Sequence, residues 1–154
     1  MKLTLSSVVR APQERVFAAL VDQAVLQRCI PGCESLVEVA PDVFDATLKI
    51  GIAGLKGTYK GKTTIRDRQP STSLTLAFEG KGGPGWVRGT AAIGLSSDDS
   101  ATRVAADAEV QVGGLIAAVG SRLIEMAAKK LSDEFFGALA AQLSGSEGSV
   151  GPGP

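Results

Sequence analysis

The chain has 154 residues, of which 44% are hydrophobic and 21% charged, a balance typical of one soluble globular domain. It contains no histidine, which excludes Ser-His-Asp and Cys-His catalysis and the HExxH zinc motif. Sixteen basic and sixteen acidic residues cancel, so no net field favours nucleic acid as a partner. The sequence opens with no signal-peptide pattern and has no apolar run of about 18 residues, which predicts a soluble cytoplasmic protein.

The N-terminal part predicts one strand followed by two short helices. Residues 2–10 have the composition of a strand, and Pro12 suits the first turn of a helix because its missing N–H is not needed there. Apolar residues at positions 16, 17 and 20 recur at helical spacing. Asp22 is positioned to cap a second helix that ends near Cys29.

The rest of the chain predicts six more strands and one long helix. Alternating apolar residues mark strands within residues 34–40, 44–52, 59–66, 74–78, 91–95 and 104–112. An apolar face at helical spacing then runs from Ile116 to about Leu143. This helix is the only predicted element long enough to cover the sheet. We therefore expect an α+β helix-grip fold: a curved seven-stranded antiparallel sheet around a long C-terminal helix, with two short helices after the first strand.

The chain is expected to form one domain over residues 1–143, followed by a disordered Gly/Ser/Pro tail at 144–154. Small inward-facing residues on the strands, together with alanines on the helix, leave space for an apolar ligand cavity. The same residues also fit close backbone approach in a filled core. The residues predicted to line the cavity and its mouth are Ile30, Pro31, Leu48, Gly61, Phe78, Gly82, Ala91, Ala106, Val119, Leu123, Met126 and Ala127.

Two motifs have the spacing of functional sites. Residues 80–85 (Gly-Lys-Gly-Gly-Pro-Gly) match G-x-G-x-x-G, but a strand is predicted on each side, whereas a dinucleotide site needs a helix after the motif. We interpret the segment as a strand-to-strand loop at the rim of the sheet, placed to act as a lid or entrance. Cys29 and Cys33 flank a turn and are interpreted as two reduced, partly buried thiols. No catalytic, cofactor-binding or metal-binding residue is predicted.

Charge is unevenly distributed along the chain. Residues 49–88 contain eight basic and two acidic residues, a net charge of +6. Lys60, Lys62, Arg66 and Arg68 share one parity and point outward together if no bulge interrupts their strand. They predict a docking face for an anionic membrane surface or an acidic partner. The alternative is that these charges protect an exposed strand from aggregation.

Several segments together resemble the family of CoxG, a carbon monoxide dehydrogenase subunit, within the START-like (SRPBCC) superfamily. They are Cys-Ile-Pro-Gly-Cys-Glu at 29–34, Gly-Leu-Lys-Gly at 54–57, Gly61, the glycines of 80–89 with Thr90-Ala91, and the helix that follows Gly113-Gly114. The resemblance covers about residues 1–143. Many members of the family continue through a flexible linker into a hydrophobic membrane segment, whereas this sequence stops at Gly-Pro-Gly-Pro.

The resemblance implies a non-catalytic accessory protein that binds a hydrophobic ligand, such as a quinone or lipid. Such a protein would assist the maturation or membrane recruitment of a carbon monoxide dehydrogenase-type molybdenum hydroxylase, whose subunits would be its partners. It would be cytoplasmic, with peripheral contact at the inner face of the membrane. Two alternatives stay open: a START-like enzyme acting on a polyketide-like substrate, and a pure protein-interaction module. An inward-facing ionisable residue such as Glu38, Lys130 or Tyr59 would favour the enzyme.

Overall fold

The computed structural model describes the backbone of residues 1–150 and the side chains through Ser144. The elements in chain order are β1 (Lys2–Val9), α1 (Gln13–Leu20), α2 (Gln23–Cys29), β2 (Cys33–Ala40), β3 (Val43–Ile50), β4 (Gly57–Gln69), β5 (Ser73–Gly82), β6 (Gly85–Asp98), β7 (Ala101–Gly114), α3 (Leu115–Ala118) and α4 (Ser121–Val150).

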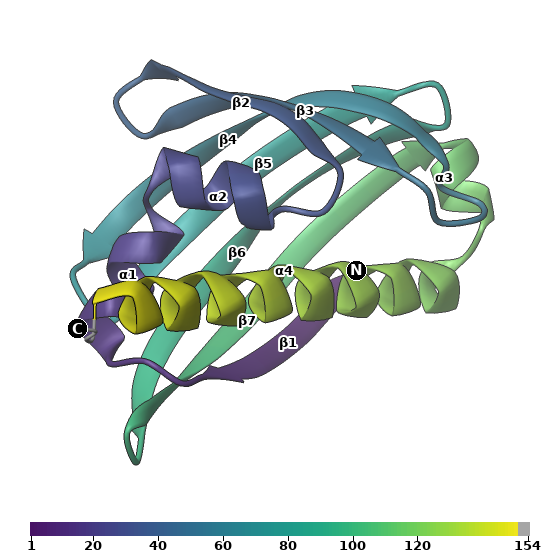
Figure 1. The fold of residues 1–154 in the computed structure, drawn as a ribbon. Coiled ribbons are helices and arrows are strands. Elements are labelled where there is room, and N and C mark those ends of the chain that lie inside the picture. Colours follow the sequence, from purple (N-terminus) through teal and green to yellow (C-terminus); the bar gives the residue numbers. More distant parts are fainter. Residues whose placement is uncertain (151–154) are drawn as a thin grey trace.

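The seven strands form one antiparallel sheet in the order β1-β7-β6-β5-β4-β3-β2. The sheet curves around α4, which crosses its concave side (Figure 1). The helices α1 and α2 lie toward the C-terminal end of α4, and α3 lies at its N-terminal end (Figure 1). This architecture confirms the helix-grip fold predicted from the strand pattern.

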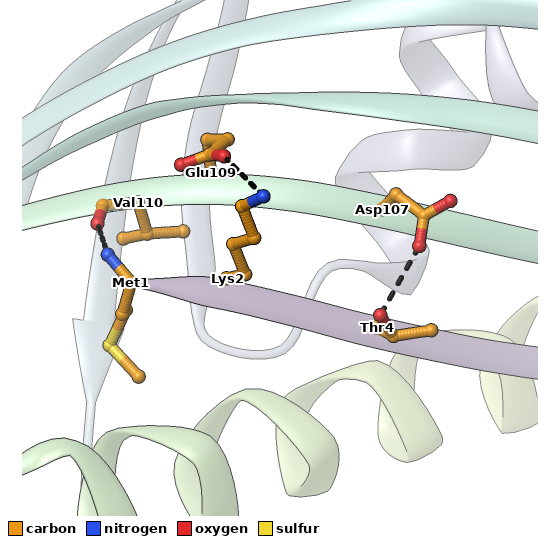
Figure 2. A network of polar contacts seen from close by, with 6 residues as sticks. All are labelled: Met1, Lys2, Thr4, Asp107, Glu109 and Val110. Carbon is orange, nitrogen blue, oxygen red and sulfur yellow. Dashed lines mark hydrogen bonds and ion pairs between the residues drawn. The ribbon is translucent and has the colours of Figure 1, made fainter.

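The first strand closes one edge of the sheet against β7. The Met1 amino group donates a hydrogen bond of 2.7 Å to the Val110 carbonyl, and the Thr4 hydroxyl donates one of 3.2 Å to the Asp107 carboxylate (Figure 2). Lys2 and Glu109 form an exposed ion pair at 3.6 Å on the same two strands. These contacts fix the register in which Leu3 and Leu5 pair with Ala108 and Ala106.

The two short helices begin as predicted. Pro12 stands immediately before α1, and the backbone N–H of Val25 donates a hydrogen bond of 3.1 Å to the Asp22 side chain at the start of α2. Both helices pack on the filled part of the core, beneath the C-terminal half of α4. Fully buried residues there include Val16, Leu139 and Val104.

The C-terminal helical region consists of two helices, where the sequence pattern predicts one. Gly120 adopts a positive φ of 90°, which ends α3 and lets α4 begin at Ser121 in a new direction. The backbone of α4 continues to Val150, past the expected end near Leu143. Residues 151–154 and the side chains beyond Ser144 lie outside the described part, so the disordered tail stays a prediction.

Candidate functional site: an apolar cavity

A cavity of about 420 Å³ lies between the concave side of the sheet and the N-terminal half of α4. Its walls are aliphatic and aromatic, contributed by six strands, the loop before β4 and both C-terminal helices. The lining residues are Leu3, Leu5, Ala46, Leu48, Ile50, Leu55, Tyr59, Gly61, Lys62, Thr63, Phe78, Glu79, Gly80, Val87, Ala91, Ala106, Ala108, Val110, Val112, Ile116, Ile124, Ala127, Ala128 and Leu131.

The cavity exists because this half of the interior is built from small residues. Ala106 and Ala108 on β7 face Ala127 and Ala128 on α4, and these four side chains are too short to fill the space between the elements. At the other end of the same helix, Leu139 is fully buried in a packed core. The two interpretations of the small residues therefore apply to different places: the interior is filled under one half of α4 and open under the other.

Two hydroxyl groups interrupt the apolar lining. Tyr59 is buried, and its phenol donates a hydrogen bond of 2.6 Å to the Leu55 carbonyl in the loop before β4. Burial raises the pKa of the Tyr59 phenol, so this group is neutral at physiological pH. Thr63 lies further along β4, on the same face of the strand. The cavity can thus bind an apolar molecule and offer it a small number of neutral polar contacts.

Six of the twelve predicted binding residues lie in this lining. They are Leu48, Gly61, Phe78, Ala91, Ala106 and Ala127. The alternation of the strands identified the first five, because residues of one parity face the helix. The same alternation marks Val110 and Val112 on β7, which the sequence prediction did not include. Leu3, Leu5 and Ile116 also line the cavity, which requires knowing that β1 pairs with β7 and that α3 covers the end of the sheet.

The predicted helix wall is wrong at three positions. Met126 is 62% exposed and points away from the sheet. Val119 and Leu123 are half-buried beside the loop before β4, where a Cβ placed on Gly54 would come within 3.3 Å and 2.9 Å of their side chains. The reason is the break at Gly120: the helical phase restarts in α4, and Ile124, Ala128 and Leu131 face the cavity together with Ala127.

The predicted mouth is also misplaced. Ile30 packs against the filled core, and Pro31 lines a separate surface depression beside Gly32. Gly82 lies outside the cavity lining, where a side chain would meet the Thr58 carbonyl and the Tyr59 ring. These residues follow α2 or end β5, and their positions depend on packing between elements that the sequence pattern does not describe.

The glycine-rich motif is a β-hairpin. Gly82 pairs with Gly85, which leaves a two-residue turn between β5 and β6. The Pro84 carbonyl accepts a hydrogen bond of 3.0 Å from the backbone N–H of Ile116, and the Pro84 ring lies close to Gly57. The interpretation as a strand-to-strand connection is confirmed, and its tip is tied to α3 and β4.

Neither cysteine faces the cavity. Both are free thiols, Cys29 buried and Cys33 partly exposed, and Cys33 donates a weak hydrogen bond to the Ser35 carbonyl. Burial raises the pKa of both thiols, while Arg28 partly opposes the shift at Cys29. A raised pKa leaves little reactive thiolate at neutral pH. Within the described residues, no group of three His, Cys, Asp or Glu side chains is placed to hold a metal ion.

The four predicted docking residues are all exposed on β4, but a bulge separates them. The register shifts between Arg66 and Gln69, and Asp67 adopts a positive φ of 53°. Lys62 pairs with Asp45 at 3.0 Å, and Arg68 pairs with Asp42. Lys60 and Arg66 form no ion pair within the described part of the chain. The common parity expected for Arg68 is therefore lost at the bulge, and two of the four charges already have carboxylate partners.

The sheet, the long helix across it and the apolar cavity between them define a START-like protein of the helix-grip type. A START superfamily protein from Mycobacterium smegmatis has a similar structure, with a TM-score of 0.70 and 13% identity over 93% of this chain and 97% of that one. A conserved protein from Geobacillus kaustophilus is more similar, with a TM-score of 0.91 and 33% identity over 95% and 97% of the two chains.

The family model for the carbon monoxide dehydrogenase subunit CoxG matches residues 6–144, and the chain belongs to this family. A search of the curated proteins found no match. Among the residues that the structure describes, no helix has both the length and the hydropathy needed to span a membrane.

Proposed function

We propose that this protein is a non-catalytic accessory protein that binds a hydrophobic ligand, a quinone or lipid, for a carbon monoxide dehydrogenase-type molybdenum hydroxylase. One observation carries the proposal: a chain of the CoxG family has an apolar cavity where its sheet and α4 leave space. The volume of about 420 Å³ lies within the usual range of small-molecule sites. It suits a ring system with part of a chain, held by apolar contacts and oriented by the hydroxyls of Tyr59 and Thr63.

The cavity supports binding more strongly than catalysis. Of the three ionisable residues that would favour an enzyme, only Tyr59 faces inward. Glu38 is exposed and accepts a hydrogen bond from the Asp42 backbone, and Lys130 is exposed beside Glu134. The Tyr59 proton is directed at the Leu55 carbonyl, so the phenol has no base beside it. The alternative function, a START-like enzyme for a hydrophobic substrate, depends on this one phenol.

The ligand gives the accessory role a physical basis. A quinone is carried in the membrane, whereas a molybdenum hydroxylase domain is water-soluble, so a cytoplasmic carrier that touches the inner face of the membrane could serve both. The basic residues on the outer face of β4, above all Lys60 and Arg66, would support such contacts through their charge. The partners that follow from the proposal are the hydroxylase subunits and a hydrophobic small molecule.

The proposal is tested by extraction of ligand from membranes. Purified protein is incubated with vesicles that contain menaquinone or ubiquinone, separated from them by centrifugation, and analysed by native mass spectrometry. We expect a complex with one quinone or one lipid per chain. Protein that returns free of both after incubation would contradict the carrier function. Tyr59→Phe should still bind, whereas turnover of a bound ligand that disappears in Tyr59→Phe would favour the enzyme.

A further inference from the structure

A second concavity of about 660 Å³ lies on the outer face of the sheet, opposite the cavity. We call it the outer groove; it is lined by Ser35, Val37, Asp45, Ala46, Thr47, Lys60, Gly61, Lys62, Glu79, Gly80, Lys81, Trp86, Val87 and Arg88. Its floor includes the backbone of Gly61 and Gly80, which pair with each other across β4 and β5. Because these two residues have no side chains, the groove is open between two rows of outward-pointing residues.

The first row is electrostatically balanced. Register pairs connect Asp45 to Lys62, Lys62 to Glu79, and Glu79 to Arg88, so acidic and basic residues alternate across four strands. Lys62 and Asp45 form an ion pair at 3.0 Å. The four formal charges of this row cancel.

The second row contains the unbalanced charge. Lys60 and Lys81 are direct register partners on β4 and β5, and both side chains are exposed on the outer face. Neither forms an ion pair within residues 1–144. Directly opposed like charges destabilise a sheet, because the paired side chains are only about 5 Å apart at Cβ. The whole net charge of +2 in the groove thus comes from these two lysines.

A rigid aromatic wall stands beside the two lysines. Trp86 is the register partner of Lys81, and its indole covers Gly113 on β7, where any side chain would overlap the ring. The Arg88 guanidinium lies 5.2 Å from the centre of the indole ring, and its Nε donates a hydrogen bond of 2.9 Å to Gln111. Trp86 nevertheless remains 37% exposed. The groove therefore offers a fixed apolar surface next to a pair of uncompensated cations.

We propose that the outer groove binds an extended acidic segment of a partner protein, with two of its carboxylates on Lys60 and Lys81 and the chain against Trp86. Alternate residues of an extended peptide lie about 6.8 Å apart, a spacing that the flexible lysine side chains can reach. A membrane surface is less suited to the site, since lipid-binding patches usually contain about four to eight basic residues and this one has a surplus of two. The inference does not depend on what occupies the cavity.

Trp86 is the only tryptophan in the chain, so its fluorescence reports directly on the groove. The probe is an N-acetylated nine-residue peptide of alternating Glu and Ser, and its control contains Gln in place of Glu. We expect the Glu peptide to change Trp86 emission saturably and less strongly as salt is raised. The double variant Lys60→Gln/Lys81→Gln should lose at least ten-fold in affinity. A matched variant, Lys129→Gln/Lys130→Gln, removes the same charge from α4, where both lysines have acidic partners, and should bind like the native protein.

Three results would overturn the inference. The first is no saturable response to the Glu peptide. The second is equal loss in both double variants, which would mean that only net charge matters. The third is a response to phosphatidylglycerol vesicles at charge concentrations where the Glu peptide gives none, which would make the groove a lipid-binding surface. Thermal melting of each variant shows that it is folded, since all four lysines are exposed.

Discussion

Phe78 covers Gly89. The two residues are register partners on β5 and β6, and a Cβ built on Gly89 would lie 3.1 Å from the tip of the Phe78 ring and would overlap the Glu109 carbonyl of β7. The missing side chain thus lets three strands approach closely where the sheet curves, and the ring covers the exposed backbone. Phe78 also lines the cavity, so this contact joins the curvature of the sheet to the shape of the site.

Gly89→Ala should destabilise the fold. The added methyl group meets backbone on β7, which can move only if the strand pairing is distorted, and overpacking of this kind usually costs about 1–3 kcal/mol. Gly94 on the same strand is the matched control because no atom lies within 4 Å of its Cβ position. Gly94→Ala should be neutral or stabilising by up to about 1 kcal/mol. Urea unfolding measures both, and equal stability of the two variants would contradict the contact.

Tyr59→Phe should loosen the loop at residues 51–56. The substitution removes the hydrogen bond that the phenol donates to the Leu55 carbonyl, with an expected loss of about 0.5–1.5 kcal/mol in unfolding free energy. Hydrogen exchange in the loop should become faster, while exchange in the distant strand β1 should not change. Unaltered exchange in the loop would mean that Gly54 packing against α4 holds the loop without help from Tyr59.

Stability under reducing conditions should fall as the pH rises above about 8.5, the ordinary pKa of a cysteine thiol. Burial raises the pKa of Cys29 and Cys33, so the unfolded chain loses its thiol protons at a lower pH than the folded chain. The stabilisation is complete below that pH and is lost as the pH rises through the folded values. Urea unfolding at about pH 7.5 and about pH 9.5, on either side of the ordinary thiol pKa, should show a smaller decline for Cys29→Ala/Cys33→Ala than for the native protein. Equal declines would contradict the assignment.

Lys81→Gln should stabilise the protein. It removes one of two directly opposed positive charges on β4 and β5, an effect of about 0.2–1 kcal/mol that should shrink at high salt. Lys62→Gln is the control with the opposite sign, since Lys62 has acidic partners on both neighbouring strands. Thermal melting at low and high ionic strength measures both changes. A stabilised variant that no longer binds the acidic peptide would show that the lysine pair is kept for binding.

The strands could be predicted because their signal is local. Alternation at Ala46, Gly61, Ala91 and Ala106 places these residues on one face, and the antiparallel order follows from the short connections between strands. The helix wall could not be predicted as well, because one glycine decides its phase. Gly120 can end α3 with a positive φ, but its identity alone does not say that it does so.

The outer groove shows a second limit of the sequence. Lys60, Lys62, Arg66 and Arg68 form an obvious basic run, yet the bulge at Asp67 and the acidic partners of Lys62 and Arg68 remove most of its unity. Lys81 is 21 positions away from Lys60 and becomes its neighbour only through the β4–β5 register. A pairing between strands of this kind is a long-range property, which composition and local charge do not contain.

The central claim is that the cavity beneath α4 binds an apolar ligand, and substitution of two adjacent alanines on β7 tests it most directly. Ala106 lines the cavity, whereas Ala105 points outward, so Ala106→Leu fills the space and Ala105→Leu adds the same group to the surface. The measurement is a fluorescence titration with N-phenyl-1-naphthylamine. We predict saturable binding of one probe per chain by the native protein and Ala105→Leu, and at least ten-fold weaker binding by folded Ala106→Leu. Equal binding by all three proteins, or none by the native protein, would contradict the claim.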